Sequence, residues 1–195
     1  MRKKLLIIIM VWVFVDQSVS QEISLSQGLG GAVYNGPFDG VSYYSAINIR
    51  YRYVSISPVF VMCSYKMPSK LDHRWHTNFG FFKQEHGKVT HTQTLNSFKL
   101  FINLYPFQLF NEKSKHFLML GLGYGLMKES AQDYLYQGDT LEAFDNRVIS
   151  RLNFAPQIAY YRYFGKTGIG IVIGKDGAIS EDGTLFTTLN LSVRL

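Results

Sequence analysis

The sequence predicts an all-β fold, an antiparallel, up-and-down, eight-stranded transmembrane β-barrel. Three observations lead to this prediction. Apolar and polar side chains alternate with a period of two in eight successive segments. No apolar run reaches the roughly 20 residues that a membrane-spanning helix needs, so a membrane protein of this sequence must cross as strands. The connections between the segments alternate between shorter and longer ones, as they do in membrane barrels.

Composition limits the chain to one domain of an unusual kind. Only 17% of the 195 residues are charged and 15% are aromatic, whereas about a quarter of a soluble chain is charged. The single cysteine, Cys63, excludes an intramolecular disulfide and a cysteine-based metal cluster. No Lys/Arg run occurs beyond the N-terminus, so the net charge of +6 does not indicate nucleic-acid binding.

The N-terminus carries an export signal. Three basic residues precede an apolar run over residues 5–15, and Ser18 and Ser20 occupy the −3 and −1 positions of a cleavage site. The run is too short to span a bilayer as a helix and fits a secretory signal peptide. We therefore expect a signal peptide over residues 1–20 and an outer-membrane β-barrel domain over residues 21–195.

The first four predicted strands each pair an apolar face with a small or polar one. In the first two, Ile, Leu, Val and Tyr alternate with Ser, Gly, Ala, Asn and Arg. In the third, Val59, Val61, Cys63 and Tyr65 are assigned to the apolar face, opposite a face that ends in Lys66. The fourth alternates Phe, Leu and Ile with Ser, Lys and Asn. These strands are expected at about residues 23–33, 41–53, 59–66 and 97–104.

Glycines mark two of the last four predicted strands. The fifth alternates Leu with Gly, the seventh alternates Ile with Gly, and the eighth runs to Leu195. The sixth contains Pro156, which lacks the N–H for a ladder hydrogen bond and indicates a bulge or an edge. These strands are expected at about residues 118–126, 151–160, 168–174 and 185–195.

The connections differ in length between the two ends of the predicted barrel. With the N-terminus on the periplasmic side, the inner turns are 55–58, 105–115 and 164–166, and the outer loops are 35–40, 67–90, 128–146 and 175–183. Both long connections then lie outside, which is the asymmetry of bacterial outer-membrane barrels. Residues 76–83 are interpreted as part of a hairpin beyond the membrane, because a ninth strand would break the even count.

Alternation alone leaves open a soluble, lipocalin-like barrel with its apolar face inside. The predicted polar faces, however, are mainly small and uncharged, whereas a soluble exterior mixes Lys, Arg, Glu and Asp. Glycines recur on these faces, where they make room inside a narrow barrel for Arg, Tyr and Phe. Tyr43, Tyr51 and Tyr53 lie near strand ends, as in aromatic girdles. We therefore predict that the apolar face contacts lipid.

In its signal peptide, strand count and loop asymmetry, the chain over residues 22–195 resembles the small outer-membrane barrels of the OmpA/OmpX-like, porin-type group. The resemblance implies a place in the bacterial outer membrane and insertion by the outer-membrane assembly machinery. The last strand should pair with the first, because an open sheet edge is not viable in lipid. Two departures are the non-aromatic final residue, Leu195, and the lack of room for a peptidoglycan-binding domain.

No residue is assigned to a catalytic, cofactor or metal site. Four histidines cluster in or beside one outer loop: His73, His76, His86 and His91. Imidazoles bind Zn²⁺ or Cu²⁺, but the nearby carboxylates are only Asp72 and Glu85, and we interpret the histidines as solvated. His116 lies near an inner turn without a serine at a recognisable spacing, so no enzyme is predicted.

Six cations are predicted to face the lumen: Arg50, Arg52, Lys66, Lys99, Arg151 and Arg194. Unpaired buried charge is expensive, so each needs a partner. The predicted strands supply no acid, and the candidate partners are water, anions or the loop acids Glu129, Asp133, Asp139, Glu142 and Asp145. The main interpretation is a packed structural plug, and the alternative is a narrow anion pore.

The predicted function is that of an integral outer-membrane protein with a non-catalytic structural or interaction role, its outer loops forming the contact surface. Outer-membrane lipids and an extracellular or periplasmic protein are the expected partners, and no cofactor or nucleic acid is expected. The alternatives are a lipid-modifying barrel enzyme, a soluble periplasmic carrier barrel and a helper in assembly or secretion.

Overall fold

A computed structural model describes the backbone of residues 21–33, 40–68, 87–111, 113–137, 140–176 and 184–195. The predicted signal peptide, the possible strand at 76–83 and three of the loop histidines, His73, His76 and His86, lie outside these residues.

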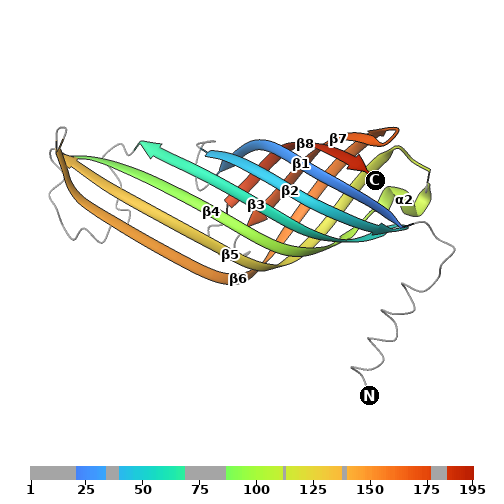
Figure 1. The fold of residues 1–195 in the computed structure, drawn as a ribbon, viewed down its shortest axis with the longest axis horizontal. Coiled ribbons are helices and arrows are strands. Elements are labelled where there is room, and N and C mark those ends of the chain that lie inside the picture. The colour runs from blue at the N-terminus through green and yellow to red at the C-terminus, as the bar shows by residue number, and fades with distance from the viewer. Residues whose placement is uncertain (1–20, 34–39, 69–86, 112, 138–139, 177–183) are drawn as a thin grey trace, which may run out of the picture.

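Eight antiparallel strands form one closed barrel, which confirms the predicted fold class and strand count (Figure 1). Each strand pairs with the next along the chain, and β1 pairs with β8 from Ser24↔Arg194 to Val33↔Leu185. The predicted closure of the last strand on the first is therefore confirmed. The strands are β1 Glu22–Val33, β2 Gly40–Tyr51, β3 Val54–Pro68, β4 Gly87–Leu104, β5 His116–Gln137, β6 Thr140–Phe164, β7 Thr167–Asp176 and β8 Thr184–Arg194.

The apolar faces point outward in seven of the strands as predicted, and in β3 the assignment was wrong. Val59, Val61 and Cys63 are buried in the lumen, whereas Phe60 and Met62 lie on the exposed outer face. The backbone of Lys66 has the same parity in β3 as that of Phe60, and its side chain lies outside the described residues. Both faces of this strand are apolar, and composition therefore could not orient it.

The turn between β2 and β3 lies three residues earlier than predicted. It is formed by Arg52 and Tyr53, and Arg52 has a positive φ of 52°. Segment 55–58 is therefore strand, and Arg52 is an exposed turn residue and not a lumenal cation. The turn between β6 and β7 lies where it was predicted, with Gly165 at φ 66°, a conformation that glycine adopts without strain.

One predicted outer loop is largely strand. Segment 128–146 was predicted as a long loop, but β5 runs to Gln137 and β6 starts at Thr140, with the two strands paired to their tips. Of the predicted loop 67–90, residues 67–68 and 87–90 are strand, with Pro68 of β3 opposite Thr90 of β4, and residues 69–86 lie outside the described part. In Figure 1, β4, β5 and β6 extend well beyond the ends of β1, β2, β7 and β8.

Pro156 marks the point where β6 loses one of its two neighbours. The β6–β7 ladder begins at Gln157↔Gly174 and runs toward Phe164, so residues 140–156 of β6 pair with β5 alone in the part of the chain described. A proline at such a position forfeits no hydrogen bond on the open side. The predicted edge at Pro156 is confirmed.

Lumenal glycines make room for aromatic rings, as predicted. A Cβ on Gly123 would lie 2.5 Å from the Phe101 ring, and one on Gly168 would lie 2.8 Å from the Tyr163 ring. Phe101 and Tyr163 are both buried. The interior of an eight-stranded barrel is only wide enough for its side chains, so glycines stand opposite several of the large rings.

Gly30→Val is expected to weaken the junction of β1 and β8. A Cβ there would overlap the backbone carbonyl of Thr187, which moves only with its strand. We expect a loss of about 1–3 kcal/mol, measured as a lower urea midpoint for the folded band on unheated gels. Leu29→Val, on the exposed outer face next to it, is the control; equal midpoints for both variants would contradict the packing at this junction.

Candidate functional site

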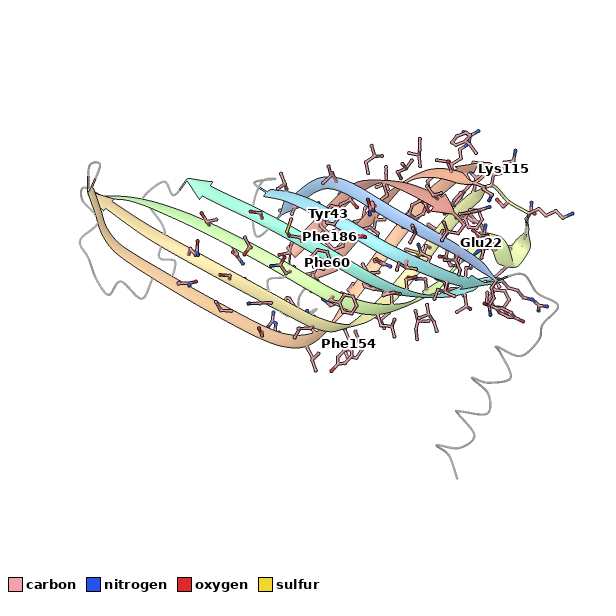
Figure 2. The ribbon with its side chains drawn as sticks, in the orientation of Figure 1. Glu22, Tyr43, Phe60, Lys115, Phe154 and Phe186 are labelled. Atoms are coloured by element: carbon pink, nitrogen blue, oxygen red, sulfur yellow. The ribbon has the colours of Figure 1, made fainter. Side chains whose placement is uncertain are left out.

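The outer wall of the barrel is an apolar belt. Leu189, Ile102 and Leu152 are exposed by 64%, 60% and 61%, and Figure 2 shows Phe154 pointing away from the wall. No helix in the described part of the chain is long and apolar enough to cross a membrane. Exposed apolar area on this scale needs a lipid environment, and the closed ladder leaves no strand edge open around the belt.

An ion cluster closes the lumen at the end of the barrel where Glu22 and Leu195 lie. The two arginines of this cluster stack on aromatic rings. The Glu22 carboxylate forms salt bridges with Arg50 and, at 2.6 Å, with Nε of Arg194. The Arg194 guanidinium carbon lies 3.7 Å from the centre of the Tyr163 ring and 4.6 Å from that of Phe117. The cavity among these groups holds about 10 Å³, which is room for one water.

A chain of hydrogen bonds crosses the middle of the lumen. Gln157 donates to Asn103 at 3.0 Å, and Asn103 donates to Ser57 at 2.8 Å. Ser57 donates in turn to Asn48 at 2.7 Å. Beyond Asn48 the contacts continue through Ser26 to Ser192, which ties β1 and β8 to the same network. Polar networks whose members are satisfied rigidify a core.

A buried ion pair lies nearer the opposite end. Nζ of Lys99 is 2.6 Å from each carboxylate oxygen of Asp176, and both side chains are at most 2% exposed. Ser97 accepts a further hydrogen bond from Lys99 at 2.5 Å, and Asn153 donates one to Asp176 at 3.2 Å. The pair joins β4 to β7 across the barrel and neutralises the one lysine in the described lumen.

Three lumenal cations, Arg50, Lys99 and Arg194, have partners other than the ones predicted. Arg50 and Arg194 pair with Glu22, and Lys99 pairs with Asp176, whereas Glu129 accepts a hydrogen bond from Gln93. The side chains of the other candidate acids, Asp133, Asp139, Glu142 and Asp145, lie outside the described part. Arg151 is not without a partner either, so its predicted pairing stays a prediction. The prediction that the strands supply no acid was wrong.

Both acids could have been found by continuing the alternation one step. Glu22 has the parity of Ser24 and Ser26, and Asp176 has the parity of Gly170 and Gly174. Glu22 precedes the first predicted strand, and Asp176 falls in segment 175–183, which was predicted as an outer loop. The lumenal faces were therefore readable in the sequence, but the strand ends were not.

The histidines form no catalytic or metal centre in the described residues. His116 lies on the outer wall, where its Nδ1 is 2.5 Å from the Tyr160 hydroxyl, and Ser114 bonds only to the backbone of His116. His91 lies in β4, but its side chain is outside the described part. No group of three His, Cys, Asp or Glu side chains among the described residues could hold a metal ion.

Some strands extend past the ends of the others and form a protruding sheet. We call it the outer sheet, and it consists of residues 66–68, 87–96, 128–137 and 140–150. Val148 and Ile149 are consecutive in β6 and are 55% and 54% exposed, so neither side of the strand faces a packed lumen at this point. At its β6 margin the outer sheet thus extends beyond the core, whereas Gln93 and Leu95 of β4 are still buried. Within the described residues, segment 140–150 of β6 pairs with β5 only, so its other side is an open strand edge.

A closed barrel with an apolar wall and a packed polar lumen is a transmembrane β-barrel. No protein-family model and no curated protein matches the sequence. Solved structures share the fold: Ail, the attachment invasion locus protein of Yersinia pestis in complex with the heparin analogue sucrose octasulfate, aligns over 90% of this chain and 99% of its own, with a TM-score of 0.52 at 10% identity. The outer membrane protein OprG of Pseudomonas aeruginosa aligns over 91% of this chain and 97% of its own, with a TM-score of 0.51 at 9% identity.

The chain therefore has the fold of small bacterial outer-membrane barrels, as the resemblance in the sequence implied.

Proposed function

We propose that the chain is an integral protein of the bacterial outer membrane with a non-catalytic interaction role, exported by the signal peptide at residues 1–20 and using the outer sheet as its contact surface. The single observation that carries this proposal is the outer sheet itself. Among the described residues, the β6 edge of this sheet has no second neighbour and carries exposed apolar side chains such as Val148 and Ile149, and such an edge is a surface that pairs with a strand of a partner. The termini and short turns then face the periplasm.

The packed lumen favours this role over that of a pore. Ion pairs and hydrogen bonds fill the described lumen at three levels, and the cavity beside Glu22 has room for one water. The position of His116 likewise favours a binding protein over a lipid-modifying enzyme, because among the described residues its ring hydrogen-bonds to Tyr160 and to no serine hydroxyl. Purified protein in detergent is expected to release no fatty acid from phospholipid or lipopolysaccharide; sustained acyl release that is lost in His116→Ala would favour the enzyme.

Impermeant thiol labelling tests the membrane placement. In a Cys63→Ser background, cysteine is introduced at exposed Ser150 in the outer sheet or at exposed Lys113 near the turns. We expect the Ser150→Cys protein to react on intact cells and the Lys113→Cys protein to react only after the outer membrane is permeabilised. Recovery of both proteins in the soluble periplasmic fraction, or the reverse labelling order, would overturn the proposal.

A further inference from the structure

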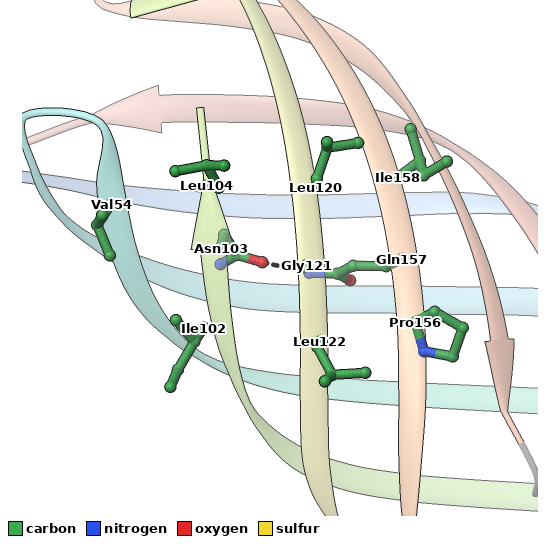
Figure 3. Close-up of a pocket in the computed structure, with 10 residues that line it drawn as sticks. All are labelled: Val54, Ile102, Asn103, Leu104, Leu120, Gly121, Leu122, Pro156, Gln157 and Ile158. Atoms are coloured by element: carbon green, nitrogen blue, oxygen red, sulfur yellow. Dashed lines mark hydrogen bonds between the residues drawn. The ribbon is translucent and has the colours of Figure 1, made fainter. Parts of the chain in front are cut away.

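A shallow groove of about 420 Å³ lies on the outer wall across β4, β5 and β6. Figure 3 shows two rows of apolar side chains on either side of Gly121 and the hydrogen-bonded Asn103 and Gln157. One end of the groove reaches Val54, the first residue of β3, so it lies toward the turns and termini. The two rows are Leu104, Leu120 and Ile158, and Ile102, Leu122 and Pro156.

The hollow follows from Pro156. Its compact ring stands between Phe154 and Ile158 on the outer face of β6 and directly opposite Leu122 of β5. The neighbouring outward side chains reach farther from the wall than the proline ring does, and they form the two sides of the groove. The result is an apolar channel in the outer wall, lined by branched side chains and Pro156, and its chemistry suits a hydrocarbon chain.

Along β5 and β6, the outward positions beyond the groove carry polar groups toward the turns. Beyond Leu120 and Ile158, the next outward pairs are Leu118 with Tyr160 and then His116 with Arg162. The Tyr160 hydroxyl is held by Nδ1 of His116 at 2.5 Å. The Arg162 guanidinium carbon lies 5.1 Å from the centre of the Phe164 ring. Within the described residues Arg162 makes no salt bridge, so its charge is available to an external anion.

We propose that this surface binds one phosphate-bearing glycerolipid of the inner leaflet, with an acyl chain in the groove and the phosphate on Arg162. This inference rests on the proposed membrane placement, which puts the turns at the periplasmic side. Arg162 lies four positions after Ile158, which is about 13 Å along the strand and about 10 Å of depth at the usual tilt of barrel strands. Such a descent leads from the acyl chain through the ester level to the phosphate. Tyr160 lies at the ester level, where an amphipathic ring is favoured.

Arginine is suited to this role because its planar guanidinium makes two parallel hydrogen bonds to a phosphate. Stacking against Phe164 holds Arg162 at the rim before any lipid arrives. The combination of an apolar channel and a positioned cation distinguishes this wall from the general lipid-facing belt, whose side chains contact any acyl chain equally.

Native mass spectrometry of the detergent-purified barrel tests the inference. With added palmitoyl-oleoyl phosphatidylglycerol, we expect one bound lipid per chain, and with palmitoyl-oleoyl glycerol, which lacks the phosphate, about tenfold weaker binding. Arg162→Gln should lose the same factor, whereas Lys175→Gln, which removes an outward cation at the opposite rim, should not. Ile158→Trp should fill the groove and reduce binding of both lipids, and Ile171→Trp on the outer face of β7 is its matched control.

The outcomes separate this inference from the proposed function, because heat-modifiable gel migration reports the barrel independently. A heat-modifiable protein that binds both lipids equally, or that binds equally well as Arg162→Gln and Lys175→Gln, overturns the lipid site and leaves the membrane placement intact. Preferential retention of lipopolysaccharide also overturns it. A protein that shows no heat-modifiable band and dissolves without detergent overturns both.

Discussion

Asp176→Ala is expected to lower the free energy of unfolding of the barrel by about 3–5 kcal/mol. The substitution leaves the Lys99 ammonium buried without its carboxylate, since both side chains are at most 2% exposed. It also removes the acceptor for Asn153. Urea titration in detergent, followed by the shift between folded and unfolded bands, measures the loss.

The matched control removes both charges together. Lys99→Met with Asp176→Leu replaces the pair by apolar side chains of similar volume, and such replacements are often neutral or stabilising. We therefore expect the double variant to recover most of the stability that Asp176→Ala loses. If the double variant were as unstable as the single one, the loss would come from packing around Asp176 and not from the uncompensated charge.

Leu189→Arg is expected to cost about 2–4 kcal/mol, the range for a cation at the bilayer midplane. Leu189 lies in the middle of β8 and is 64% exposed on the outer wall. In a protein whose exterior faced water, an arginine at so exposed a position would be nearly neutral. Folding into lipid vesicles under a urea gradient measures the cost.

A second position on the same strand supplies the internal control. Leu185 also faces outward but lies near the outer end of β8, and an arginine near the interface costs only about 0–1 kcal/mol. The cost should therefore fall from Leu189→Arg to Leu185→Arg. Equal costs at the two depths would argue against a bilayer around this strand.

Fold and orientation were readable from the sequence because both rest on binary patterning. Seven strands carry one clearly apolar and one small or polar face, and that contrast decides which side meets lipid. In β3 the contrast vanishes, since Val59 and Val61 alternate with Phe60 and Met62. The structure resolves the ambiguity through registry: Ala46↔Val59 and Tyr44↔Val61 place these valines beside inward residues of β2.

Strand ends and charge pairs were not readable because they depend on contacts far apart in the chain. Segment 128–146 is rich in polar residues, which indicates a loop, yet β5 and β6 pair through it once each has the other as a neighbour. Glu22 and Asp176 were missed as lumenal acids for the same reason. Lys99 and Asp176 are 77 positions apart, and only the closed barrel brings them together.

The relaxation of spin labels by oxygen or by a water-soluble nickel chelate reports whether a side chain faces lipid or the lumen. Labels are placed at outward Ile49 and Leu120 and at lumenal Ser26 and Asn190, whose side chains are 40%, 41%, 1% and 1% exposed. In bilayers, dissolved oxygen should relax the two outward labels strongly, because it concentrates in the hydrocarbon, while the lumenal labels should respond weakly. Strong oxygen contact at Ser26 and Asn190, with water-soluble nickel chelate reaching Ile49 and Leu120, would mean that the barrel is inside out and is no membrane protein.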